Sequence, residues 1–84
     1  MEINVGLKHI VRGEKESALS CPIALAMQEQ LDNPEIQVGA ELFWLKDGEP
    51  FNDLPDIACD FIYAYDRGEP VYPISFEIPP VRSR

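Results

Sequence analysis

The sequence predicts an α+β domain, with a mostly antiparallel sheet of four or five strands that carries two main helices and one short helix on one face. Apolar and polar residues alternate near both ends of the chain, whereas two segments between them have apolar residues at helical spacing. A hairpin signal, Asp47-Gly48, lies between two extended segments. Helices and strands grouped along the chain in this way favour antiparallel pairing.

The N-terminal segment predicts a strand followed by a short helix. Ile3 and Val5 alternate with polar residues, as in a strand with one buried face. Residues 7–11 then change to helical spacing. We expect Gly13 to end this helix at positive φ, because glycine adopts that conformation without steric penalty.

The second helix is expected to open at Ser20, with Pro22 in its first turn, where a missing N–H is tolerated. Asn33 and Pro34 should end it. Its apolar side is narrow and contains alanine, which allows close approach to a neighbouring element. This side consists of Ile23, Ala26, Met27 and Leu31.

Extended segments follow the second helix. Ile36 and Val38 alternate with polar residues, and residues 41–46 and 49–52 are expected to form a hairpin around the Asp47-Gly48 turn. Pro50 marks the returning arm as an edge strand, because proline cannot donate a ladder hydrogen bond.

A third helix is expected from Asp53, two residues before Pro55, to Arg67. Gly68 should follow its end at positive φ. Its inward stripe should contain Ile57, Ala58, Phe61, Ile62 and Tyr65. Its outward stripe should contain Asp56, Asp60, Tyr63 and Arg67. A last strand with one buried face should contain Ile74, Phe76 and Ile78. We therefore expect one domain over residues 1–78 and a flexible C-terminal tail over residues 79–84.

The charge of the chain favours basic partners. Fifteen acidic and seven basic residues give a formal net charge of −8, and eleven of the acids lie within residues 29–69 with only two bases. Because binding to DNA or RNA requires clustered Lys and Arg, we do not expect direct nucleic-acid binding. An acidic field of this kind instead steers the protein towards basic protein surfaces.

The N-terminal residues predict neither a signal peptide nor a membrane anchor. Charged residues interrupt every apolar run, and none approaches the roughly 18 residues of a membrane-spanning helix. We expect a cytoplasmic protein without membrane contact, in which Cys21 and Cys59 remain free thiols.

Five segments of the chain resemble a group of small uncharacterised proteins of tailed phages and bacterial mobile elements. These segments are residues 20–26 (Ser-Cys-Pro-Ile-Ala-Leu-Ala), 54–55, 61–62, 65–71 (Tyr-Asp-Arg-Gly-Glu-Pro-Val) and 73–76. Tyr65 and Ile74 stand where the group would have Phe, and both keep an apolar body. The resemblance spans nearly the whole chain and implies a phage or mobile-element protein, but no catalytic residue.

Catalytic chemistry finds little support in the sequence. Cys21 lies near a helix N-terminus, which lowers a thiol pKa, but nothing places His9, the only histidine, beside it. We expect Cys21 to be a packing residue and His9 to face solvent. The chain lacks a close Cys or His pair for zinc and a glycine-rich phosphate loop, so we expect no enzyme activity, metal or cofactor.

The acidic residues of the hairpin and the third helix form the candidate partner-binding site. Its residues are Asp47, Glu49, Asp53, Asp56, Asp60 and Tyr63. Side chains four apart on a helix lie about 5 to 6 Å from each other, close to the roughly 7 Å between phosphates of one nucleic-acid strand. A carboxylate stripe can therefore imitate a nucleic-acid backbone.

The sequence leaves three functions open. The leading hypothesis is a small acidic protein that blocks or modulates a host protein with a basic surface, such as a nucleic-acid-binding or defence component. The second is an assembly accessory that self-associates through the hairpin edge. The third is a thiol-dependent enzyme or redox sensor that uses Cys21. We expect a monomer or a weak homodimer.

Overall fold

Three helices and five short strands follow one another, among the residues that the structure describes, in the order that the sequence predicts. The computed structural model describes residues 1–46 and 50–79. Its elements are β1 (Glu2–Val5), α1 (Leu7–Arg12), α2 (Pro22–Gln30), β2 (Gln37–Val38), β3 (Leu42–Trp44), β4 (Asn52–Asp53), α3 (Asp56–Asp66) and β5 (Ile74–Glu77). All strand pairs are antiparallel, which confirms the α+β class. Of the expected flexible tail, only Pro79 belongs to the described residues.

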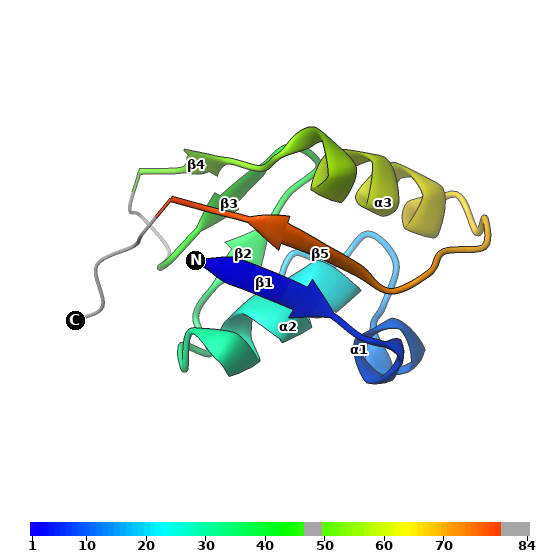
Figure 1. Cartoon of the computed structure of the whole chain (residues 1–84), viewed down its shortest axis with the longest axis horizontal. Helices are drawn as coiled ribbons and strands as arrows, with labels where there is room; N and C mark the ends of the chain where they lie inside the picture. The colour runs from blue at the N-terminus through cyan, green and yellow to red at the C-terminus, as the bar shows by residue number, and fades with distance from the viewer. Residues whose placement is uncertain (47–49, 80–84) are drawn as a thin grey trace.

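The two ends of the described chain pair with each other. β1 and β5 form a two-stranded ribbon at the front of the molecule (Figure 1), in which Ile3 lies opposite Phe76. The N–H of Ile78 donates to the carbonyl oxygen of Met1, 2.9 Å away, and so extends the pairing beyond β5. Ile3, Val5, Phe76 and Ile78 are buried, as the alternation predicts.

The other three strands form a second antiparallel sheet with the order β2-β3-β4. The predicted hairpin is present, because Leu42 of β3 lies opposite Asp53 of β4. Its turn residues, Asp47 and Gly48, lie outside the described residues.

The five strands of the described residues divide between two small sheets, and α2 packs against both. Its buried residues lie on several sides, whereas Glu29 stays exposed. β1 of one sheet, β2 of the other and α1 together cover these sides. The sequence indicated only a narrow apolar face, since Ala24 was not recognised as part of the core.

Both long helices begin nearer to their prolines than predicted. The residue before a proline is held extended, so Cys21, not Ser20, is the N-cap of α2. Its Sγ accepts a hydrogen bond from the N–H of Ala24, 3.4 Å away. In α3 the N-cap is Pro55 itself, and Asp53 belongs to β4.

The two glycines expected at positive φ behave differently. Gly68, after α3, has φ +80°, as predicted. Gly13 has φ −68°, so that prediction is wrong. A Cβ atom at Gly13 would lie 2.6 Å from the ring of Pro22, which shows that close approach of the chain, not a left-handed turn, requires a glycine here.

The helical register of α3 is largely as predicted. Ala58, Phe61 and Ile62 are buried, and Tyr65 is partly buried against the core. The four residues of the outward stripe are exposed: Asp56, Asp60, Tyr63 and Arg67. Ile57 is the exception, because it is 47% exposed instead of buried. It lies in the first turn at the margin of the inward stripe, where the core does not reach.

Within the described ranges 1–46 and 50–79, the helices are too short and too polar to cross a membrane.

Candidate functional site

The outer side of α3 presents two carboxylates one helical turn apart. Asp56 lies in the first turn, where negative charge is favourable beside the helix N-terminus. Asp60 follows four residues later and occupies the middle of the exposed side, with Ile57 three residues before it and Tyr63 three residues after it. Residues three or four apart are neighbours on a helix surface, so Asp60 is flanked by one carboxylate, one aliphatic group and one aromatic ring.

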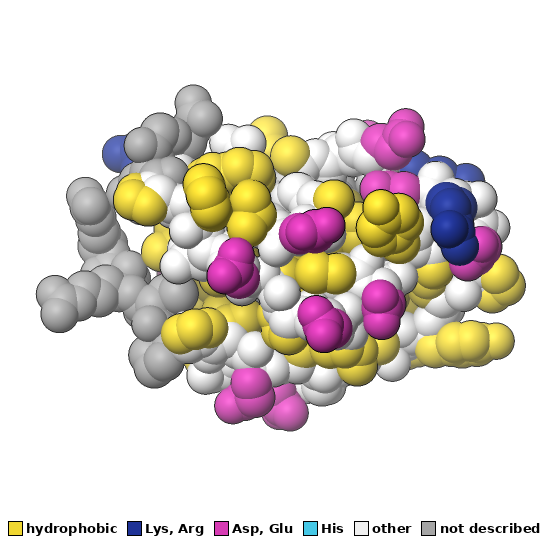
Figure 2. Space-filling view, turned by 90° about the horizontal axis from the view of Figure 1, so that it is seen from above, with side chains coloured by type: hydrophobic (Ala, Val, Ile, Leu, Met, Phe, Trp, Pro, Cys, Tyr) yellow, Lys and Arg dark blue, Asp and Glu magenta, His cyan; other side chains and the backbone are white. Residues whose placement is uncertain are grey.

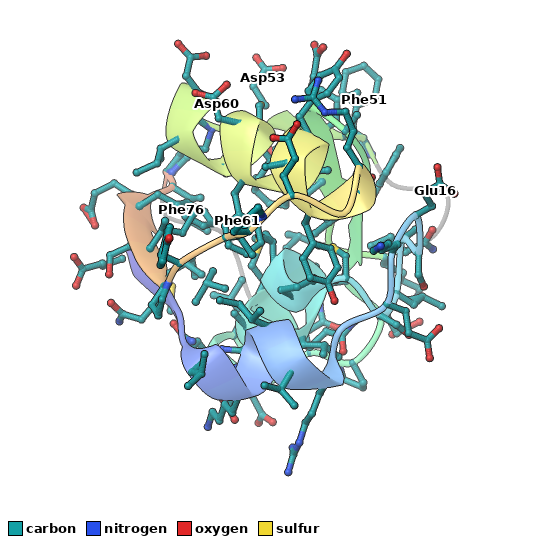
Figure 3. The ribbon with its side chains drawn as sticks, turned by 90° about the vertical axis from the view of Figure 1, so that its right-hand side faces the viewer. Glu16, Phe51, Asp53, Asp60, Phe61 and Phe76 are labelled. Carbon is teal, nitrogen blue, oxygen red and sulfur yellow. The ribbon has the colours of Figure 1, made fainter. Side chains whose placement is uncertain are left out.

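The short strand β4 adds residues from the hairpin to this side. In Figure 3, Phe51, Asp53 and Asp60 point outward on the same side of the molecule. Only Leu54 and Pro55 separate β4 from α3, and this short connection places Asp53 near the start of the helix. Asp47 and Glu49, the other two members of the predicted site, lie outside the described residues.

The surface formed in this way combines acidic and apolar side chains. We refer to it as the α3–β4 face and define it by Phe51, Asp53, Asp56, Ile57, Asp60 and Tyr63. Phe51 is 59% exposed and Tyr63 58% exposed. Figure 2, which views the α3 side from above, shows acidic side chains interspersed with hydrophobic ones.

Two features of the α3–β4 face were missed from the sequence. Ile57 was predicted to face inward, and Phe51 was predicted only as part of the returning hairpin arm, residues 49–52. Glu41 was also missed as a neighbour. Its carbonyl oxygen accepts a hydrogen bond from the N–H of Leu54, 2.9 Å away, which brings it beside the start of α3. The register of the hairpin was the only sequence signal for this proximity.

The negative charges of these carboxylates also affect the thiol of Cys59, which lies on α3. Burial, and after it the negative charges of Glu41, Asp56 and Asp60, raise the pKa of the Cys59 thiol. The Cys59 Sγ donates a hydrogen bond to the carbonyl oxygen of Leu54, 3.6 Å away. This thiol is therefore held in its neutral form at physiological pH.

No internal cation neutralises the α3–β4 face within the part of the chain that the structure describes. The ion pairs of the described residues join the Met1 ammonium to Glu77, Lys8 to Glu29, and Arg67 to Glu69. Asp53, Asp56 and Asp60 take part in none of them. Arg67, at the end of α3, is the nearest basic residue in sequence, and Glu69 already engages it.

Cys21, the predicted packing residue, lies in the core. It is 5% exposed and lines one wall of a cavity of about 220 Å³ that Glu16 and Asp66 also line. Burial raises the pKa of the Cys21 thiol, and the charge of Asp66 raises it further, which outweighs the hydrogen bond from Ala24. A neutral, buried thiol is a poor nucleophile.

His9 is buried, contrary to the prediction that it faces solvent. The N–H of Gly6 donates to Nδ1 at 2.8 Å, so the ring proton lies on Nε2, which donates to Oε1 of Glu29 at 3.1 Å. α1 packs against α2, and this hydrogen bond joins the ring to Glu29 of that helix, twenty residues away in sequence. With both nitrogens engaged, His9 has no free nitrogen for acid–base work.

A shallow groove of about 400 Å³ runs between α1 and α2, with Lys8, His9, Arg12 and Glu29 among its lining residues. The lining holds two basic side chains, Lys8 and Arg12, and two acidic ones, Glu29 and Asp32, so its charges balance in number. Lys8 forms an ion pair with Glu29. Over residues 1–46 and 50–79, no group of three or more His, Cys, Asp or Glu side chains has the arrangement of a metal site.

No protein-family model, curated protein or solved structure matches this chain.

Proposed function

We propose that this chain is a non-enzymatic binding protein that uses the α3–β4 face to hold a partner protein with a basic surface. One observation carries the proposal: Asp53, Asp56 and Asp60 are exposed on one side, and none of them takes part in an ion pair among the described residues. In a chain of net charge −8 this surface attracts basic partners at long range.

The class of partner follows from the spacing of the carboxylates. Asp56 and Asp60 are separated by one helical turn, which brings their carboxylates to a distance comparable with that between phosphates of one strand. We propose that the partner is a nucleic-acid-binding or defence protein of a bacterial host, whose basic groove the acidic face occupies. The resemblance of residues 20–26 and 65–71 to phage and mobile-element proteins supports such a role.

Affinity capture followed by competition with DNA tests this proposal. The immobilised chain is expected to retain host proteins that elute at moderate salt and that duplex DNA displaces. The double variant Asp56→Lys with Asp60→Lys should lose them, because it reverses the charge of the α3–β4 face.

A control variant separates the face from the net charge. Glu2→Lys with Glu35→Lys makes the same change in net charge at two exposed positions outside the α3–β4 face. It should retain the captured proteins nearly as well as the wild type. If both variants lose the captured proteins equally, net charge alone explains the binding, and the α3–β4 face is not the binding surface.

Self-association through the hairpin edge is the second candidate. β4 is the outer strand of its sheet, and Phe51 beside it is 59% exposed. An unpaired edge next to an exposed ring can pair with a second copy. Sedimentation velocity over a range of concentrations tests this role: a dimer that Phe51→Lys dissociates would support it, and a monomer at all concentrations would exclude it.

A further inference from the structure

We infer that the α3–β4 face binds a basic amphipathic helix, in which Lys or Arg side chains flank an apolar stripe. The inference rests on the proposed function and specifies the shape and chemistry of what is bound. A purely polar basic groove could be bound by the carboxylates alone. A basic amphipathic helix also requires the apolar residues of the face.

The α3–β4 face carries exposed apolar side chains as well as acidic ones. Ile57 and Tyr63 lie three residues to either side of Asp60 on α3. Phe51 precedes β4 on the hairpin and lies on the same side of the molecule as Asp60 (Figure 3). Together they contribute three of the eight large hydrophobic side chains that are exposed within the described residues. Opposite a polar groove they would face charged groups and lose water without gaining apolar contacts. Opposite an apolar stripe their burial favours binding.

The acidic residues of the face carry three negative charges, those of Asp53, Asp56 and Asp60. The three carboxylates form no ion pair within the described parts of the chain, so they are open to basic groups of a bound molecule. Acidic and apolar groups alternate along α3 as Asp56, Ile57, Asp60 and Tyr63. A partner that satisfies both must therefore present basic and apolar groups close together.

A helix fits the α3–β4 face better than an added β-strand does. A β-strand could add to β4, but β4 has only two residues, and Pro50, two residues before it, lacks an N–H to donate. A helix needs no backbone partner. It displays an apolar stripe beside polar residues and packs against another helix through side chains at three- and four-residue spacing. The exposed side of α3 offers this spacing.

The test uses two synthetic peptides of identical composition. The first is an 18-residue peptide of Leu and Lys whose leucines form one helical stripe. The second contains the same residues in an order without a stripe. Each is titrated into the full chain by calorimetry at two salt concentrations, and amide shifts locate the binding surface. We expect the amphipathic peptide to bind about tenfold more tightly, with shifts at Ile57, Asp60 and Tyr63.

Two variants locate the apolar contribution. Ile57→Ser with Tyr63→Ser should reduce the affinity for the amphipathic peptide to that of the scrambled one, without weakening the binding of the scrambled peptide. The matched control is Leu7→Ser with Val11→Ser on α1, which removes two apolar side chains that are 65% and 75% exposed. This control should leave both affinities unchanged.

The possible outcomes separate the inference from the proposed function. Equal binding of the two peptides, or an equal loss in the α1 control, overturns the inference. If Asp56→Lys with Asp60→Lys still weakens both peptides in that case, the acidic surface of the proposed function stands. If that charge reversal leaves both affinities unchanged, the α3–β4 face is not the binding surface and both proposals fail.

Discussion

The hydroxyl group of Tyr65 donates a hydrogen bond to the carbonyl oxygen of Gly13, 2.8 Å away, and so fastens α3 to the end of α1. The carbonyl oxygen of Ile10, at 3.2 Å, shares the same donor. The last carbonyls of a helix have no partner within it, so a donor from elsewhere stabilises the helix end. A six-residue helix such as α1 depends strongly on such contacts.

Tyr65→Phe should therefore lower the free energy of unfolding by about 1 kcal/mol, the usual net contribution of one hydrogen bond. The substitution keeps the ring that stacks on Phe61 at a centroid distance of 6.1 Å, so the hydroxyl group alone is tested. Urea denaturation measures the change. Tyr63→Phe is the control, because that ring is exposed and its substitution should have almost no effect. A Tyr65→Phe variant as stable as the control would show that the hydrogen bond contributes nothing.

Gly68→Val should destabilise the protein by roughly 1 to 2 kcal/mol, because a β-branched residue at positive φ is strained. The φ of Gly68 is +80°, and a Cβ atom there would also lie 3.1 Å from Nζ of Lys15. Gly68→Asn should reduce the stability less than Gly68→Val does, since asparagine tolerates this conformation better. If thermal unfolding shows that the two variants are equally stable, the positive φ is not the cause of the destabilisation. Steric crowding by the added side chain would then be the remaining explanation.

The order of elements and the exposed side of α3 were predictable because they follow from local spacing. Asp56, Asp60 and Tyr63 recur at helical intervals, and Gly68 marks the end of the helix. The burial of His9 was not predictable, since it depends on the packing of α1 against α2. That Phe51 lies on the same side of the molecule as Asp60 depends on the hairpin register, and the division into two sheets depends on which strands pair. Such properties of the assembled layers leave no periodic signal in the sequence.

Cys59 should react with an alkylating reagent before Cys21 does. Burial raises the pKa of both thiols, but Cys21 lies in the core, whereas Cys59 is only partly buried. Mass spectrometry of digested peptides after timed labelling at neutral pH measures the order. Cys59→Ser should abolish the faster phase. Rapid labelling of Cys21 in the folded protein would instead revive the hypothesis of a thiol-dependent activity.

Glu29→Gln should reduce stability at neutral pH more than at pH 3. The hydrogen bond from Lys8, and after it that from His9, holds the pKa of the Glu29 carboxyl below its ordinary value of 4.5. The folded state therefore binds fewer protons than the unfolded state in this range. The resulting stabilisation is present above the unfolded pKa and is lost as the pH falls through the folded one.

Urea midpoints of the wild type and the Glu29→Gln variant at pH 7 and pH 3 test this dependence. Glu35→Gln, at an exposed position, is the matched control and should show a small difference at both values. If the gap between the wild type and Glu29→Gln is as wide at pH 3 as at pH 7, the carboxylate charge is not the source of the stabilisation.

Asp60→Lys should separate binding from stability. In the wild type, Asp56 and Asp60 are like charges four residues apart, which disfavours the helix slightly. A lysine at position 60 would instead follow an acidic residue at the favourable spacing, so the free energy of unfolding should rise by about 0.2 to 0.5 kcal/mol. Binding of the basic partner should weaken, because the central carboxylate of the α3–β4 face is replaced by a positive charge.

The same reversal at the start of the helix provides the comparison. Asp56→Lys removes a favourable negative charge from the first turn of α3 and should lower stability by about 0.3 to 1 kcal/mol. Opposite signs of the two stability changes, with weaker binding in both variants, are expected from denaturation and calorimetry. A marked loss of stability in Asp60→Lys would mean that this side chain makes contacts in the folded protein, and that position 60 does not belong to an open binding surface.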